Sequence, residues 1–184
     1  MKILGVDPGS HRTGWGLVLA NGSKLTHLAS GTITTGDGQL ATRLKRIADE
    51  LDQTFVSQAP AAVAVETIFH AKNARSALLL GHARGVALLC AARHGAPIFE
   101  YTAGQIKQAM TGFGRADKHQ VQEMVRLILG HDERMSLDAS DALAAAICHA
   151  QCEASPTAKA LDQLMRDAER APNPLRAFAI EGRS

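Results

Sequence analysis

Two short apolar runs of this chain each end in a carboxylate, and this pattern restricts the fold more than any other. The first run, Ile3 to Val6, ends at Asp7, and the second, Ala61 to Val65, ends at Glu66. Short and wholly apolar runs are typical of strands that are buried on both faces. Because an ionised carboxylate beside a core is strongly disfavoured unless it is paired or binds a metal, both acids need a cationic partner.

Two further acids, Asp138 and Asp141, begin an alanine-rich helix pattern that continues through residues 142–150. They are three residues apart, so both can face the same site. Four acids on at least three elements predict a site for divalent metal, since hard cations prefer oxygen ligands. Metal sites of this kind are used to cut or transfer phosphoryl groups. Two structural alternatives remain: Asp7 simply begins a turn with Pro8-Gly9, and Asp138 is an N-terminal helix cap.

The apolar periodicity predicts an α/β fold with a five-stranded mixed sheet flanked by helices. The turn signal Asn21-Gly22 predicts that the chain opens with an antiparallel meander. We expect strands over 2–7, 15–20, 24–35, 61–66 and 98–101, and helices over 40–55, 74–93, 102–110 and 137–153. Thr102 is the expected N-terminal cap of the 102–110 helix. Asp117 is the expected cap of a further helix that runs through Ile128, and a flexible connector over 111–114 joins the two helices.

The length of 184 residues suits one compact domain with a tail. We expect a catalytic domain over 1–155 and a C-terminal appendix over 156–184, partly helical or disordered, because three prolines interrupt its pattern. No apolar run approaches the ~20 residues that span a bilayer, and no signal-peptide pattern opens the chain. The cysteines Cys90, Cys148 and Cys152 have no pairing or zinc spacing, and we expect buried, reduced thiols. The predicted location is the cytoplasm, without a membrane partner.

The net charge of +2 does not by itself indicate a nucleic-acid partner. The distribution of charge is more informative, because eight Lys and Arg against three acids give the stretch from Thr67 to Arg126 a net +5. This basic stretch and the four acids are separated in sequence. The separation favours a division in which the basic stretch binds DNA and the acids bind metal.

These residues together resemble the RuvC family, the crossover junction endodeoxyribonucleases or Holliday junction resolvases. The resemblance spans roughly residues 1–153 and rests on order and spacing in Ile3 to Ser10, Thr13 to Gly16, Val65-Glu66, Arg75 to Ala77, Arg84-Gly85 and Asp138 to Ala142. It implies a ribonuclease H-like fold and a homodimer that needs Mg²⁺, with Mn²⁺ as a substitute. It also implies symmetric paired nicks in four-way DNA junctions during homologous recombination and DNA repair, with the junction-migration proteins RuvA and RuvB as partners.

The catalytic carboxylates of the family match Asp7, Glu66, Asp138 and Asp141. Two-metal hydrolysis gives these residues roles: Asp7 bridges both ions, Glu66 and Asp141 each serve one, and Asp138 is a ligand or assists water activation. The expected products carry 5′-phosphate and 3′-hydroxyl ends. The resemblance places Phe69 near the junction centre and Lys107 and Lys118 on DNA. Arg75 and Arg115 are further candidate DNA contacts, and small residues of the 74–93 helix are implied in the dimer interface.

Two other function classes remain open from the sequence. One is an actin-like ATPase or sugar kinase, because Asp7 to Ser10 with Thr13-Gly14 superficially resembles the first phosphate loop of that superfamily. The chain has no second motif of that kind, and measurable ATP binding would support this class. The other is a junction-binding module without cleavage, which would bind junctions tightly but leave them uncut in the presence of metal.

Overall fold

The fold is built on a five-stranded mixed sheet in the order β3-β2-β1-β4-β5. The structure is a computed structural model that describes residues 1–67, 73–131 and 135–155. β1 pairs antiparallel with β2 and parallel with β4, so the opening meander and the later strands meet at β1. The strands are β1 (Lys2–Asp7), β2 (Arg12–Asn21), β3 (Lys24–Thr34), β4 (Ala62–Thr67) and β5 (Ile98–Thr102). The five predicted strands are thereby confirmed, with β2 beginning three residues earlier than expected.

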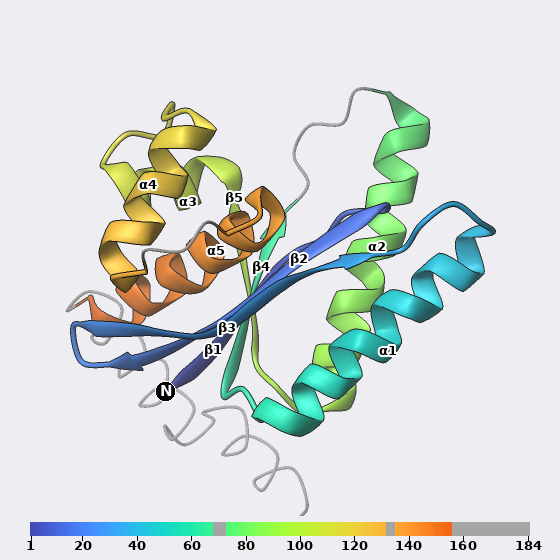
Figure 1. The fold of residues 1–184 in the computed structure, drawn as a ribbon, viewed down its shortest axis with the longest axis horizontal. Coiled ribbons are helices and arrows are strands. Elements are labelled where there is room, and N and C mark those ends of the chain that lie inside the picture. Colours follow the sequence, from blue (N-terminus) through green and yellow to red (C-terminus); the bar gives the residue numbers. More distant parts are fainter. Residues whose placement is uncertain (68–72, 132–134, 156–184) are drawn as a thin grey trace, which may run out of the picture. The chain divides into compact units, whose positions relative to one another are not determined.

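Helices cover both faces of the sheet (Figure 1). On one face α1 and α2 pack over a core that includes Leu4, Leu17 and Val63. On the other face α5, with α3 and α4 beside it, packs over a core that includes Ile3 and Val18. The helices are α1 (Leu40–Gln58), α2 (Ala74–Arg93), α3 (Ala103–Thr111), α4 (Lys118–Leu129) and α5 (Leu137–Ala154).

The helix starts follow local hydrogen-bonding rules. Thr102 and Asp117 each accept from the backbone N–H three residues on, and both form a capping box, as predicted for the caps. At α5 the Ser136 hydroxyl, not the Asp138 carboxylate, accepts from the Ala139 N–H at 3.2 Å. Ser136 also hydrogen-bonds Thr32 of β3 at 2.7 Å, which ties the start of α5 to the sheet. The capping interpretation of Asp138 is therefore wrong, and its carboxylate is available for other contacts.

Glycines allow α5 to lie directly against the backbone of β1 and β2. A Cβ on Gly5 would lie 1.8 Å from the Ala142 carbonyl oxygen, and one on Gly14 would lie 1.9 Å from that of Asp138. Real Cβ atoms do not approach backbone oxygen this closely, so only glycine fits at either position. The depth at which α5 sits on the sheet, and with it the position of Asp138 and Asp141, depends on this contact.

The described residues fall into two units, Met1–Gln151 and a second that begins at Cys152. The predicted appendix lies outside the described residues. No described helix is long and apolar enough to cross a membrane. All three cysteines are free, and Cys90 and Cys148 are buried as expected. Cys152 is exposed, like the other residues of the last turn of α5, which corrects the expectation of a buried thiol there.

We predict that Gly5→Ala destabilises the protein by about 1–3 kcal/mol or more, because the added methyl overlaps a backbone carbonyl that cannot rotate away. Urea unfolding followed by circular dichroism measures the change. Gly38→Ala is the matched control, since a Cβ there meets nothing within 4 Å and the backbone does not have a positive φ. Equal stability of the two variants would contradict the close packing of α5 on β1.

Candidate active site

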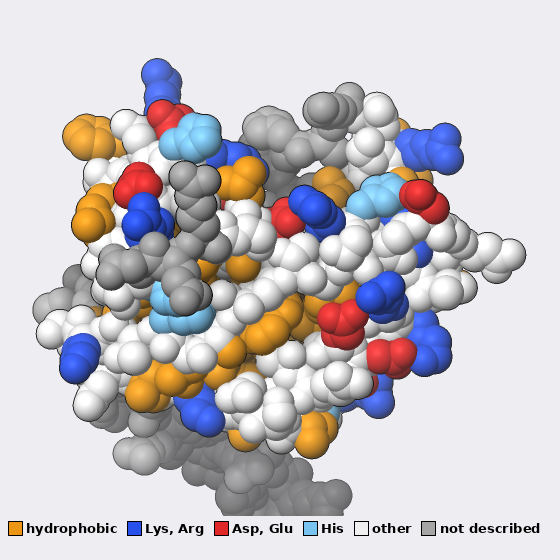
Figure 2. Space-filling view, in the orientation of Figure 1, with side chains coloured by type: hydrophobic (Ala, Val, Ile, Leu, Met, Phe, Trp, Pro, Cys, Tyr) orange, Lys and Arg blue, Asp and Glu red, His pale blue; other side chains and the backbone are white. Residues whose placement is uncertain are grey.

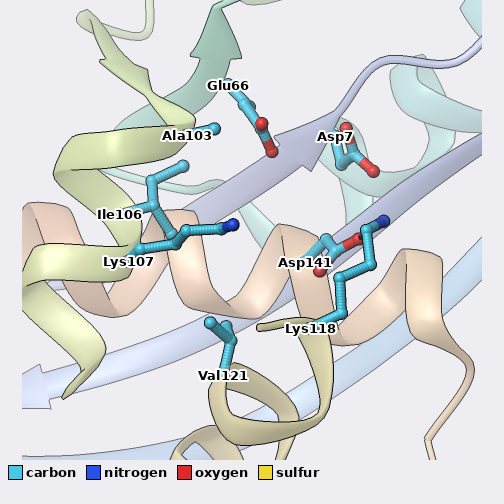
Figure 3. A pocket seen from close by; sticks show the side chains of 8 residues that line it. All are labelled: Asp7, Glu66, Ala103, Ile106, Lys107, Lys118, Val121 and Asp141. Carbon is cyan, nitrogen blue, oxygen red and sulfur yellow. Dashed lines mark hydrogen bonds and ion pairs between the residues drawn. The ribbon is translucent and has the colours of Figure 1, made fainter. Parts of the chain in front are cut away.

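Three of the predicted acids and two of the predicted lysines line one pocket at the end of the sheet. Figure 3 shows the carboxylates of Asp7, Glu66 and Asp141 pointing into this pocket from one side, with Lys107 and Lys118 reaching in from α3 and α4. The remaining wall is formed by Ala103, Ile106 and Val121. We call this the acidic pocket.

Asp7 and Glu66 stand side by side because of strand register. The parallel pairing of β1 with β4 runs to Val6 opposite Val65, and each acid is the next residue along its strand. Burial, and then repulsion by Glu66, Asp141 and Asp138, raise the pKa of Asp7 to about 7, although Lys118 acts in the opposite direction. The pKa of Glu66 is also raised, by burial and by Asp141, while Lys118 and Lys107 counteract the rise.

The third acid, Asp141, is held by a lysine. The Lys118 ammonium lies 3.2 Å from the Asp141 carboxylate, at the N-terminal end of α4. Asp141, together with Asp7 and Glu66, raises the pKa of Lys118, so the side chain is fully charged at neutral pH. The protein therefore places its own cation among the acids, which offsets part of their mutual repulsion.

Asp138 differs from the other three acids. It lies on α5 one turn before Asp141 but does not line the acidic pocket. Its carboxylate is 3.7 Å from the Arg12 guanidinium at the start of β2. It is still close enough for its charge to help raise the pKa of Asp7, less than Glu66 and Asp141 do. The structure thus brings Asp138 to the edge of the site, with Arg12 as a partner that the sequence pattern did not indicate.

The predicted DNA contacts are distributed unevenly. Lys107 lines the acidic pocket, Arg115 is exposed on the α3–α4 connector, and Arg75 is exposed in the first turn of α2. Phe69 lies outside the described residues. The basic stretch is less available than its net charge indicates, because Arg84, Arg93 and Arg126 pair with carboxylates. Figure 2 shows positive and negative side chains alternating over α1, where Lys45 and Arg46 pair with acids one turn on.

The donor set of the acidic pocket fits a hard divalent cation. Its acidic groups are all carboxylates, whose oxygens magnesium and manganese prefer, and three of them converge where, in the described part of the chain, the only ion-paired lysine is Lys118 on Asp141. Among the described residues no three His, Cys, Asp or Glu side chains are already close enough to hold a metal ion. Asp7, Glu66 and Asp141 would hold the ion after side-chain rotation and release of Asp141 from Lys118.

The geometry can be compared with known proteins at this point. The family model for crossover junction endodeoxyribonuclease RuvC matches residues 3–149. This chain belongs to the RuvC family. The matched range contains all four predicted acids and both predicted lysines.

Individual relatives agree with this assignment. The RuvC crossover junction endodeoxyribonuclease of Syntrophotalea carbinolica is 55% identical over 153 residues, which cover 83% of this chain and 95% of the relative. That of Trichlorobacter lovleyi is 50% identical, over 81% of this chain and 84% of the relative. Among solved structures, T. thermophilus RuvC in complex with a Holliday junction substrate superposes with a TM-score of 0.77 at 35% identity, covering 82% of this chain and 93% of the other. The ribonuclease H-like fold predicted from the sequence is confirmed.

The raised pKa of Asp7 predicts a specific pH dependence of stability without divalent metal. Asp7 retains its proton in the native state up to a pKa of about 7, whereas the unfolded chain releases it near the usual value of 3.8. The native state binds more protons over this interval, so this contribution lowers the free energy of unfolding as pH rises from about 4 to about 7. Asp7→Asn removes this contribution. From about pH 4 to about pH 7 we expect the free energy of unfolding of the variant to rise by roughly 2–4 kcal/mol relative to that of wild type.

Urea unfolding of both proteins in chelator, at intervals from pH 4 to 8, measures this difference. Asp37→Asn, which alters an exposed acid outside the pocket, is the control and should follow the wild-type curve. A constant difference between Asp7→Asn and wild type at every pH would contradict the burial and repulsion assigned to Asp7.

Proposed function

We propose that this chain, a crossover junction endodeoxyribonuclease of the RuvC family, resolves Holliday junctions by symmetric paired nicks during homologous recombination and repair. The observation that carries the proposal is the convergence of Asp7, Glu66 and Asp141 in one pocket beside two lysines. Such a pocket can hold cations against a phosphate, and the lysines extend its positive charge toward a bound strand. The proposed products carry 5′-phosphate and 3′-hydroxyl ends.

We further propose Mg²⁺ as the metal, two ions per site, with Mn²⁺ as a substitute. When bound, the ions activate water and neutralise charge on the attacked phosphate. Asp7 ends the central strand β1, beside the end of β4 that carries Glu66, which supports a role in bridging both positions. Glu66 and Asp141 approach from β4 and α5 and each complete one position. Asp138, paired with Arg12, remains a candidate ligand or an aid to positioning water.

The lysines have separate tasks in this proposal. Lys118 neutralises Asp141 while the pocket lacks another cation, and its ammonium becomes available for contact with a phosphate once Asp141 is released. Lys107, across the pocket on α3, stabilises the Glu66 carboxylate electrostatically and is the second phosphate contact. Arg75 and Arg115, which do not line the acidic pocket, remain proposed DNA contacts, and so does Phe69.

Asp7→Asn should reduce cleavage of a synthetic four-way junction by roughly 10³-fold or more while junction binding is retained, because the amide keeps the shape but loses the charge that attracts metal. Gel analysis in magnesium measures both nicks, and binding is measured without divalent metal. Asp37→Asn should cleave normally. Unchanged cleavage by Asp7→Asn would contradict the role of Asp7, and tight binding by a wild type that never cleaves would favour the junction-binding module.

We propose that the enzyme acts as a homodimer through the outer face of α2. Leu78 and Leu89 on this helix are 66% and 58% exposed, and Gly81 and Gly85 between them leave open space where a side chain would stand. A small and apolar face of this kind permits close helix contact with a second copy. Two active sites related by a two-fold axis match the symmetry of a four-way junction.

Leu89→Arg should convert the dimer to a monomer, because it places a charge on the apolar α2 face where close contact is proposed. Light scattering coupled to size-exclusion chromatography measures the mass, and junction assays should then give single rather than paired nicks. Val56→Arg, at a 76% exposed position on α1, is the control and should remain dimeric. A dimeric Leu89→Arg protein would place the interface elsewhere.

Other predictions also remain proposals. We propose RuvA and RuvB as partners, the cytoplasm as location, and a division into a nuclease domain over 1–155 and an appendix over 156–184. The free cysteines suit a reducing compartment. The ATPase or sugar kinase hypothesis loses its basis with the family assignment, because Asp7 to Thr13 then forms part of the nuclease pattern.

A further inference from the structure

A second groove lies next to the acidic pocket along α3 and α4, which contribute residues to both. Its walls include the apolar side chains of Met110, Ala116 and Met124, with Phe113 and Arg115 from the connector between the two helices. We call this the connector groove. Nothing in the proposed metal chemistry uses it.

Phe113 is presented to solvent by an ordered turn. Its side chain is 74% exposed. The glycine-rich connector was expected to be flexible, yet the Thr111 hydroxyl contacts the Lys107 carbonyl and both backbone groups of Phe113. Gly112 ends α3 with a positive φ of 77°, and the Ala116 N–H donates to the Phe113 carbonyl. These hydrogen bonds fix the backbone of Phe113, and its exposed aromatic side chain therefore extends from a position that is set before any partner binds.

The connector groove and the acidic pocket are separated by about one helical turn. Ile106 lines the acidic pocket and Met110, four residues on along α3, lines the groove, a rise of about 6 Å. On α4, Val121 lines the pocket while its neighbour Gln120 lines the groove. Successive nucleotides of a strand are ~3.4 Å apart along a duplex. A strand with its phosphate at the acidic pocket therefore reaches the groove one or two nucleotides away.

The charges around the groove suit the same occupant. Lys107 and Lys118 lie on the pocket side and Arg115 on the groove side, so cations border the path of a strand. Glu123, the acid in the groove, is paired with Arg126, which reduces its repulsion of phosphate. Aromatic faces bind bases of any sequence by stacking, and a nearby arginine adds a contact to the backbone.

We propose that Phe113 stacks on a nucleobase one or two nucleotides from the scissile phosphate, with Arg115 contacting the adjoining backbone. The inference rests on the proposed junction cleavage and adds to it a binding contact outside the metal pocket. Phe113 thereby fixes the register of the strand in the acidic pocket and influences which phosphate is cut.

The test is a cycle that combines Phe113→Ala with abasic sites in the junction. Affinity is measured without divalent metal, so that no strand is cut. We expect Phe113→Ala to weaken binding of the intact junction about tenfold. An abasic site one or two nucleotides from the cut should weaken binding to wild type similarly, and Phe113→Ala should add little to that loss. Phe113→Trp should restore binding. Leu127→Ala, at an equally exposed position (72%) near the far end of α4, is the matched control and should bind normally.

Three results would overturn the inference: wild-type affinity of Phe113→Ala, additive losses at every abasic position, or a change of oligomeric state that assigns Phe113 to a contact between copies. Thermal unfolding checks that the variants are folded. We expect them to be folded, because the Phe113 side chain is exposed and contributes little to the core. If wild type itself neither binds nor cleaves junctions, the proposed function fails, and that result is distinct from any of these three.

Discussion

The contact between α5 and the backbone of β1 and β2 determines where the acidic groups of this protein lie. Gly5 and Gly14 bring the helix so close that a single methyl group would overlap its carbonyl oxygens. Asp141 reaches the pocket from this helix, and Asp7 and Glu66 reach it from the ends of adjacent strands. If α5 moved outward to accommodate a methyl group, Asp141 would move away from the two strand carboxylates. The pocket would then lose one of its three carboxylates.

This convergence has an electrostatic cost that the structure only partly offsets. Asp7 is partly buried beside three other acids. Its pKa is raised first by burial and then by the repulsion of these acids, which Lys118 only partly offsets. Lys118 stabilises Asp141 directly, while Lys107 acts on Glu66 from across the pocket. Elsewhere much of the basic charge is neutralised within the molecule, as at Arg84 and Arg126. The residual negative charge of the pocket supports its proposed role in binding divalent cations.

Sequence patterns were sufficient for the parts of the fold that depend on local rules. Buried strands ending in Asp7 and Glu66, and the caps Thr102 and Asp117, follow from apolar runs and side-chain hydrogen bonding within a few residues. The spacing of Asp138 and Asp141 correctly placed both on one helix. It could not show that Asp141 lines the acidic pocket while Asp138 does not. Their division depends on Arg12, more than a hundred residues away in sequence, which binds Asp138 at the rim. The ordered presentation of Phe113 was missed because a glycine-rich segment gives no sign of the Thr111 hydroxyl contacts that fix it.

The central claim, that the acidic pocket is a metal centre, is tested most directly by anomalous diffraction from crystals of the protein grown with Mn²⁺. Our account predicts manganese density bounded by Asp7, Glu66 and Asp141, with the Lys118 ammonium displaced from Asp141. Manganese bound elsewhere, or a pocket in which Lys118 stays paired with Asp141 at saturating metal, would contradict it.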